Sequence, residues 1–360
     1  MTLRWKGGTL QQKLKIVLFS LTPVLALVLV AQFLAFLTIH RATIEHGTDP
    51  VTGLSYYSMS IGHWPWSHVN TTPLNSLGLP GDELVNVLPK GQCKHVVFAG
   101  DSFTFGDGVD WEDSYFMRLS RLSARRNPDR CIRFFNVAER MTTIEQQLDR
   151  VRETWHLIEP DAIVLGQYQN DLSDLTNPGS IGHQENVGAV QHDNQWGNVL
   201  RRVVPGYDIS LIRFLTYRVF AALIRNDVAY DTPLGTWSVL ESGRESGQAD
   251  RLKAFYRDFY EEIVEEVRSR DAEFAAVIFP SKLDLLAQRY PEGEFYRQLA
   301  GEFEVPHISM YSVLDSVRAG YPYHMYDGHL NEYGNAVVAV RLVEWLFDDS
   351  PAPLPTLREP

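Results

Sequence analysis

Three short stretches of the chain carry side chains that together could perform nucleophilic catalysis. Gly100-Asp101-Ser102 ends an apolar run, Asn170 follows another, and Asp327-Gly328-His329 stands before the last apolar helix. Acyl transfer by serine needs a hydroxyl, a base that takes its proton, a group that orients the base, and donors for the oxyanion. The chain offers one candidate for each role, in that order: Ser102, His329, Asp327 and Asn170.

The elements around these residues predict an α/β domain with a parallel sheet, because short apolar runs alternate with helical stretches. The expected strands are 95–100, 132–137, 161–166, 274–279 and 306–310. The expected helices are 113–125, 143–158, 249–268, 283–290, 294–303 and 336–347. Ligands in such sheets bind beyond the carboxyl ends of the strands, so we expect Asn170 to lie near Ser102.

Each motif alone has a simpler interpretation. Gly-Asp-Ser also makes an ordinary turn and helix N-cap, and Asp101 would then only hydrogen-bond the turn that presents Ser102. His324 stands three residues before Asp327 and competes with His329 for the role of base. The position of His329 in the last motif favours it.

Taken together, the motifs resemble those of the SGNH, or GDSL-like, hydrolases over about residues 91 to 345. The matching blocks are Gly100–Gly106, Asn170-Asp171, and Asp327–Asn331 followed by Gly334. The resemblance implies a three-layer, flavodoxin-like α/β sandwich with Ser102 as nucleophile and Asp327 and His329 as its partners. It also implies an oxyanion hole from the Ser102 N–H, the Asn170 side chain and the Met141 N–H, with Asp101 in support. No metal or organic cofactor is implied.

Two features differ from the usual pattern of this family. Met141 stands where the family carries a glycine, and a side chain there would strain the loop if φ must be positive. Asp327 and His329 are separated by one residue instead of two, a spacing similar to that of SGNH proteins that act on polysaccharide acetyl groups. The resemblance therefore implies an esterase or O-acyltransferase for ester-linked acyl groups of glycans, with acetyl groups favoured. The alternatives are a lipid or small-ester esterase, and a weakened module that binds an envelope polysaccharide or protein.

The N-terminus predicts a membrane anchor. Residues 16–39 form an uncharged apolar run of 24 residues, long enough to cross a hydrocarbon core of about 30 Å. Arg4, Lys6, Lys13 and Lys15 precede it, so residues 1–15 are expected in the cytoplasm and the main domain outside the cytoplasmic membrane, in the periplasm of a bacterium. A cleaved signal peptide is the alternative, but its apolar region would be shorter.

Three further regions are expected to lack regular strands. Residues 40–90 are rich in turn residues and read as an irregular lead-in packed on the domain, where Trp64 and Trp66 could line a substrate groove. Residues 174–249 interrupt the α/β pattern as an insertion, whose apolar helix 211–224 is too short and too charged for a second span. Residues 348–360 form a Pro-rich tail.

Charge and cysteine content exclude several classes of function. The net charge is −12 without a long basic block, which argues against a nucleic-acid partner. The chain has two cysteines and no clustered Cys/His motif, which argues against a zinc site. Cys93 and Cys131 precede strands that would be neighbours, so an oxidising compartment would permit a disulfide between them. Two unpaired, partly buried thiols are the alternative.

Overall fold

A computed structural model gives the fold. It describes residues 44–48, 55–61, 68–81, 83–84, 91–175, 211–227, 231–232, 235–242, 247–317, 321–324 and 328–347, with isolated residues between 19 and 30.

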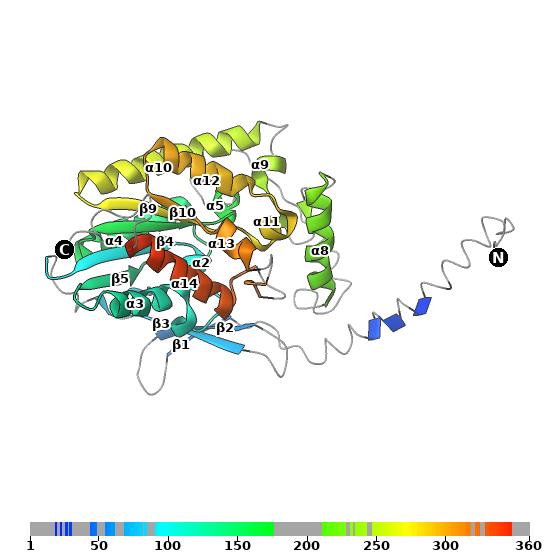
Figure 1. Cartoon of the computed structure of the whole chain (residues 1–360), viewed down its shortest axis with the longest axis horizontal. Helices are drawn as coiled ribbons and strands as arrows, with labels where there is room; N and C mark the ends of the chain where they lie inside the picture. The colour runs from blue at the N-terminus through cyan, green and yellow to red at the C-terminus, as the bar shows by residue number, and fades with distance from the viewer. Residues whose placement is uncertain are drawn as a thin grey trace.

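A five-stranded parallel sheet forms the centre of the molecule (Figure 1). Its strands are β4 (Lys94–Gly100), β5 (Ile132–Asn136), β6 (Ala162–Gln167), β9 (Glu273–Ile278) and β10 (His307–Ser309). They lie in the order β10-β9-β6-β4-β5, and every neighbouring pair is parallel. This is the order of flavodoxin-like doubly wound sheets, so the prediction of a parallel α/β fold of this type is confirmed.

Helices cover both faces of the sheet and make three layers (Figure 1). Successive strand residues point to opposite faces. Val97 and Ile163 therefore pack with α4 (Ile144–Ile158), α10 (Gln248–Ser269) and α12 (Pro291–Glu302). Val96 and Val164 pack on the other face with α3 (Tyr115–Arg126), α11 (Lys282–Ala287), α13 (Tyr311–Ser316) and α14 (Glu332–Phe347). Burial on both faces explains why β4 and β6 read as continuous apolar runs.

The prediction of an irregular lead-in over 40–90 is wrong for three stretches. β1 (Ile44–Thr48), β2 (Ser55–Ile61) and β3 (His68–Leu74) form an antiparallel sheet. In the sequence of β2, the apolar residues Tyr57, Met59 and Ile61 alternate with serines. This period-2 pattern is typical of a strand, but the turn residues around it obscured the signal. The Thr71 N–H donates to Asp110 Oδ1 (3.1 Å) and ties β3 to the α/β domain. Trp64 and Trp66 lie outside the described residues.

Most of the predicted anchor, residues 16–39, lies outside the described residues, as do 1–15 and the tail 348–360. The residues of the anchor that are described, such as Leu27 and Val30, are helical and exposed. Among the described helices, none is both long enough and apolar enough to cross a membrane. The anchor and its orientation therefore stay predictions.

The described part of the predicted insertion adds a helix, a small hairpin and one helical turn. These are α8 (Leu211–Arg225), β7 (Asp231–Thr232) with β8 (Gly235–Thr236), and α9 (Val239–Ser242). α8 packs on α11 through a small apolar cluster that includes Tyr217, Trp237 and Leu283. This contact agrees with a packed crossover helix.

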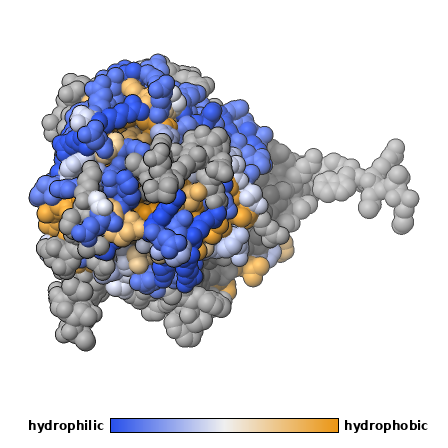
Figure 2. All heavy atoms as spheres, turned by 60° about the vertical axis from the view of Figure 1, so that its left-hand side comes forward, coloured by the Kyte–Doolittle hydropathy of each residue, from blue (hydrophilic) through white to orange (hydrophobic). Residues whose placement is uncertain are grey.

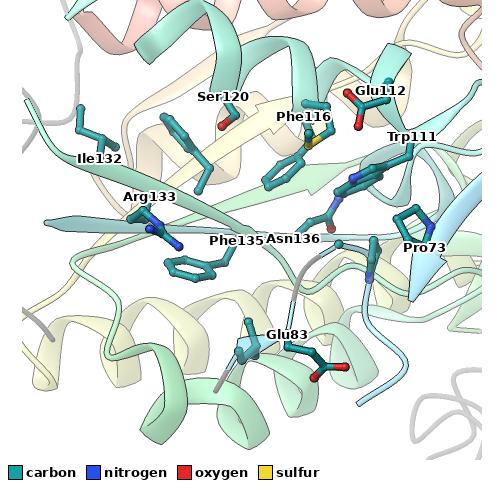
Figure 3. A pocket seen from close by; sticks show the side chains of 15 residues that line it. Pro73, Glu83, Trp111, Glu112, Phe116, Ser120, Ile132, Arg133, Phe135 and Asn136 are labelled. Atoms are coloured by element: carbon teal, nitrogen blue, oxygen red, sulfur yellow. The ribbon is translucent and has the colours of Figure 1, made fainter. Parts of the chain in front are cut away.

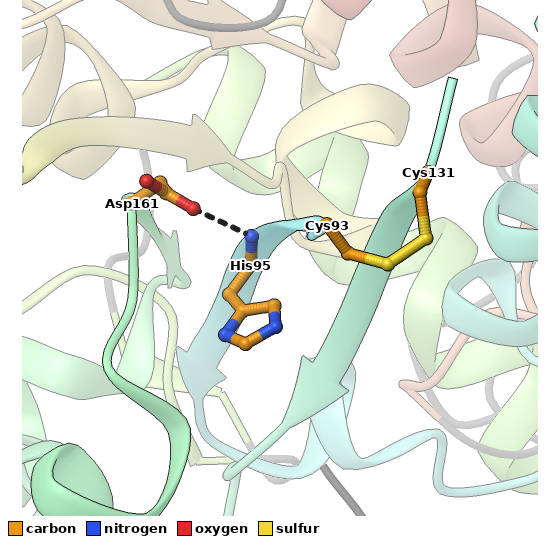
Figure 4. The surroundings of a disulfide bond; sticks show 4 residues. All are labelled: Cys93, His95, Cys131 and Asp161. Atoms are coloured by element: carbon orange, nitrogen blue, oxygen red, sulfur yellow. Dashed lines mark hydrogen bonds between the residues drawn. A yellow bond between two sulfur atoms is a disulfide. The ribbon is translucent and has the colours of Figure 1, made fainter. Parts of the chain in front are cut away.

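Cys93 and Cys131 form a disulfide with a Cα–Cα distance of 4.6 Å (Figure 4). The two residues stand just before β4 and β5, which are adjacent and parallel, and the Lys94 N–H donates to the Cys131 carbonyl (2.8 Å). Nearby, the His95 N–H donates to Asp161 Oδ2 (2.9 Å), the bond drawn in Figure 4. The disulfide and these bonds hold together the amino ends of three strands.

The face of the molecule in Figure 2 is largely hydrophilic, with smaller apolar patches between the polar residues. Exposed apolar side chains of the described residues include Leu215 and Val219 on α8 and Val340 on α14. Single exposed apolar residues are normal on a globular surface.

Candidate active site

Ser102 and His329 meet at the carboxyl end of β4, although 227 residues separate them in the chain. Ser102 Oγ lies 2.9 Å from His329 Nε2, within hydrogen-bond distance, and the serine is half-buried. The hydroxyl can donate to Nε2 if the imidazole carries its proton on Nδ1, a tautomer that we assign from this contact. A serine and a base in this geometry form the core of a nucleophilic site.

The backbone around Ser102 is fixed by close packing. Gly100 has φ 154°, and a Cβ atom there would lie 2.9 Å from the Cβ of Thr104. Asp101 caps α2 (Ser102–Phe105) by accepting a hydrogen bond from the Phe103 N–H (3.0 Å). The turn therefore presents Ser102 at the edge of the sheet. Asp101 makes the N-cap hydrogen bond that the simpler interpretation of the Gly-Asp-Ser motif expects.

Burial raises the pKa of the Asp101 carboxyl, which is completely enclosed. The Phe103 N–H, the nearby His329 and the Asn170 amide lower it, but they do not offset the effect of burial. The charge of His329 and the Asn170 amide, from the proposed base and oxyanion donor, therefore both act on the Asp101 carboxyl.

The loop that carries His329 is held by backbone and asparagine contacts. The His324 N–H donates to the His329 carbonyl (3.0 Å), and Tyr323 pairs with Leu330 in an antiparallel bridge. Asn335 donates to the Leu330 carbonyl (3.1 Å) and accepts from the Tyr115 N–H (2.8 Å), which links the loop to α3. These contacts hold the backbone of the loop that carries His329. The imidazole ring lies 5.3 Å from the ring of Phe103.

A glycine is required next to this loop. At Gly334, a Cβ atom would collide with the Pro322 carbonyl oxygen, the acceptor of the Asn331 N–H (2.9 Å). Any larger residue at 334 would push α14 away from the loop that carries His329.

Asn170 begins α5 (Asn170–Asp174), just after β6. Gly100 of β4 pairs with Gly166 of β6, so the loops that carry Ser102 and Asn170 leave the sheet side by side. This is the point where the strand order reverses, the place where ligands bind in doubly wound sheets. The Asn170 Nδ2 donates to Asp174 Oδ2 (2.7 Å), and a ligand oxygen could replace that acceptor.

Met141 has a left-handed backbone conformation, with φ 55°. Its side chain is 80% exposed. The loop between β5 and α4 thus has the positive φ that a glycine would provide, in spite of the methionine. The sequence raised the concern that Met141 would alter the loop, and the structure instead places it in that conformation.

Of the other predicted site residues, Asp327 lies outside the described residues. His324, the competing base, packs against Gly108, where a Cβ atom would lie 2.9 Å from His324 Nε2. The contact with Ser102 is made by His329.

Sequence reasoning missed Asp107 and Arg140. Asp107 Oδ2 lies 3.9 Å from His329 Nε2, and Arg140 Nε donates to both Asp107 oxygens (2.7 and 2.5 Å). Asp107 follows the first motif directly, but no spacing in the sequence connects it to Arg140, 33 residues later.

A pocket in the described part of the chain lies away from this site. A pocket of about 450 Å³ lies along β5, between α3 and residues 73–84. Figure 3 shows Phe116 and Ser120 of α3 on one side and Arg133 and Phe135 of β5 on another. None of the predicted catalytic residues lines it, so we base the site on the contact between Ser102 and His329.

Two buried acids, Asp284 and Glu292, lie in α11 and α12. Burial raises the pKa of Asp284 to about 7 and that of Glu292 to about 8. The Trp237 indole donates to Asp284 (2.9 Å), and Ser238 donates to Glu292 (2.6 Å). Lys282, two residues before Asp284, donates to the His324 carbonyl (2.7 Å) and connects this cluster to the loop.

Because the pKa values of these two acids are raised, we expect the free energy of unfolding to be lower at alkaline pH. The ordinary pKa values of these side chains are 3.8 and 4.5, so between about pH 5 and 8 the folded state binds more protons than the unfolded state. Their contribution is complete at low pH and is lost as pH rises through about 7 and 8. Urea unfolding at pH 5.5 and 8.5 should show the loss, at about 1.4 kcal/mol for each pKa unit as an upper limit.

The double variant Asp284→Asn with Glu292→Gln should show a flatter dependence of unfolding free energy on pH. Glu302→Gln, which removes a half-exposed acid, is the control and should keep the dependence of the parent. An equal slope in parent and double variant would show that these carboxyls do not titrate between the two pH values.

No group of three or more His, Cys, Asp or Glu side chains in the described ranges is arranged to hold a metal ion.

Comparison with known proteins gives weak likenesses. No model of a known protein family matches the chain. Acetyl-CoA carboxylase of Schizosaccharomyces pombe is 26% identical over 140 residues, which are 38% of this chain. The chain spans only about 6% of the length of that protein, so the match says nothing of a shared activity.

Among solved structures, the chain is similar to a putative lipolytic protein of the G-D-S-L family from Desulfitobacterium hafniense, with 12% identity and a TM-score of 0.39 over 70% of this chain and 98% of the other. A lipase/acylhydrolase from Enterococcus faecalis has 12% identity and a TM-score of 0.39, over 70% of this chain and 94% of the other. The acetyl xylan esterase AlAXEase has 13% identity and a TM-score of 0.39, over 69% of this chain and 97% of the other. Likenesses this distant carry no argument about function, and the fold rests on the sheet order of the chain itself.

Proposed function

We propose that this chain is a serine ester hydrolase or O-acyltransferase. The contact between Ser102 Oγ and His329 Nε2 (2.9 Å), at the reversal point of a doubly wound sheet, carries the proposal. A half-buried serine bound to an imidazole can be activated as a nucleophile. The motif resemblance to SGNH hydrolases points to the same reaction class.

The proposed mechanism uses the groups around Ser102. As Oγ attacks the ester carbonyl carbon, its proton passes to His329 Nε2, and the resulting imidazolium protonates the leaving alcohol as the C–O bond breaks. The Ser102 N–H, the Asn170 amide and the Met141 N–H are the proposed donors to the oxyanion. Water or a sugar hydroxyl then attacks the acyl-enzyme, with His329 again as base. Asp327 is the proposed group that orients the imidazole.

For the substrate, we propose ester-linked acyl groups, acetyl above all, on glycans outside the cytoplasmic membrane. The support is the Asp-x-His spacing at 327 and 329, the basic residues before the apolar run 16–39, and the Cys93–Cys131 disulfide. Disulfides persist in oxidising compartments. The membrane anchor belongs to the proposal for the same reasons.

The proposal is tested by labelling the full chain in detergent with a fluorophosphonate and identifying the modified peptide by mass spectrometry. The expected product is a single adduct on Ser102, together with turnover of an activated acetyl ester. An acetylated oligosaccharide then separates release of acetate to water from transfer to a second sugar. Absence of both adduct and turnover in folded protein would reject the enzyme and favour a binding module. Turnover of long-chain esters alone would favour a lipid esterase.

Replacing Asn170 by alanine is expected to lower kcat by about 10²- to 10³-fold, the usual cost of removing one oxyanion donor. KM should change little, because the donor acts on charge that develops in the transition state. Steady-state kinetics with the activated acetyl ester measure both. Asn226→Ala, at the exposed end of α8, is the matched control. An unchanged kcat in Asn170→Ala would remove this side chain from the oxyanion hole.

A further inference from the structure

We infer that the ion pair between Asp107 and Arg140 holds the turn at Glu139–Thr142 so that Met141 keeps its left-handed conformation, and thereby positions the backbone N–H of Met141. The inference rests on the proposed function, since that N–H is one of the proposed oxyanion donors. Asp107 and Arg140 are positioning residues in this scheme, and neither needs to touch the substrate.

The conformation of Met141 needs a cause outside its own side chain. An L-residue with φ 55° is strained and persists only where its surroundings impose that conformation. The Met141 side chain is 80% exposed, so its packing cannot supply the constraint. Glycine or asparagine normally occupies such a turn position.

The neighbouring residue provides the constraint. Arg140 Nε donates to Asp107 Oδ1 (2.7 Å) and Oδ2 (2.5 Å). The Asp107 side chain is 1% exposed and that of Arg140 16% exposed, so solvent screens this pair little. Breaking a buried pair leaves a charge without compensation, which makes the contact resistant to loop motion.

The pair connects the turn to the nucleophile. The Asp107 N–H donates to the Ser102 carbonyl (3.0 Å), so Asp107 is fixed relative to Ser102. Arg140 is thereby held at a set distance from the same backbone. The Glu139 N–H adds a bond to the Gly100 carbonyl (3.2 Å), and Thr142 Oγ1 closes the turn onto the Glu139 carbonyl (2.7 Å). With its ends fixed and Arg140 anchored, the turn has little freedom except at Met141.

A double-variant cycle tests the inference. Arg140→Ala is expected to lower kcat for the activated acetyl ester by about 10- to 100-fold, the effect of a small misplacement of catalytic geometry. In a chain that already carries Met141→Gly, the same change should cost less than about 3-fold, because glycine reaches positive φ without help. Rescue by glycine separates a backbone role from an electrostatic one, since glycine at 141 cannot replace the charge that the buried Asp107 loses with Arg140. Arg152→Ala, which removes ion pairs to α10, is the control for loss of an arginine and should keep the activity of the parent.

A structure of the Arg140→Ala chain provides a readout that does not depend on activity. We expect φ at Met141 to leave the left-handed region. A φ that stays near 55°, or an equal loss of kcat in both backgrounds, would overturn the inference even if the chain is an esterase. If the parent shows neither turnover nor labelling, the proposed function fails, and the φ measurement still decides the inference. Should Arg140→Ala not fold, Arg140→Lys keeps the charge without the guanidinium and enters the same cycle.

Discussion

Replacing Ser102 by alanine is expected to lower kcat/KM for an activated acetyl ester by at least about 10⁴-fold, the usual effect of losing a catalytic nucleophile. The change removes the one oxygen within hydrogen-bond reach of His329 Nε2 that can form an acyl-enzyme in the described site. It should leave the fold intact, because the side chain is small and the Ser102 backbone keeps its bonds to Gly106 and Asp107. Steady-state kinetics and fluorophosphonate labelling measure the loss, and the adduct should disappear with it.

A matched control is available on α3. Ser123 is buried, and its hydroxyl has no hydrogen-bond partner among the described residues, so Ser123→Ala removes an equivalent atom away from the site. This variant should keep the activity of the parent. If Ser102→Ala retains labelling and turnover while it unfolds at the temperature of the parent, another residue is the nucleophile.

The strand and helix pattern of the α/β domain was predictable because the burial of each element determines where its sequence is apolar. β4 and β6 are covered on both faces and are therefore apolar over 96–99 and 162–165, with polar residues only at their ends. β5, at the edge of the described sheet, keeps Arg133 exposed within an otherwise apolar run. The order of the strands then brings Ser102 and Asn170 together at the reversal point, as expected.

The sheet at β1–β3 was not predictable to the same degree. His68–Leu74 contains Asn70 and Pro73, residues that are depleted in strands, and its pairing with β2 supplies what local preference lacks. Pairing between segments is a tertiary property, so turn-rich composition led to the wrong interpretation of this region.

Asp107 and Arg140 illustrate what the sequence alone does not contain. Each looks like an ordinary charged loop residue, and their contact exists only because α2 and the turn after β5 end at the same sheet edge. Methionine itself gives no signal for the left-handed φ of Met141, which was suggested only by the alignment of this residue with the glycine of the family that the motifs resemble. Motif matching pointed to Ser102 and His329 as the proposed nucleophile and base, but the groups that hold their loops depend on packing.

Replacing His329 by glutamine is expected to lower kcat by about 10⁴-fold or more, close to the loss for Ser102, because the two act as a unit. Glutamine can still hydrogen-bond to Ser102 Oγ but cannot take its proton at neutral pH. Hydroxide would then be the remaining base, so the residual activity of His329→Gln should increase steadily with pH. Initial rates from pH 6 to 10 measure this dependence, and labelling of Ser102 should be slowed in parallel.

His324→Gln provides the control, because His324 lies on the same loop and is the alternative base. Its backbone N–H, which donates to the His329 carbonyl, is unchanged by the substitution. We expect this variant to keep nearly the full kcat of the parent. A large loss in His324→Gln together with an active His329→Gln would transfer the role of base to His324. Losses of equal size in both would instead mean that the loop, and not one imidazole, is what the reaction requires.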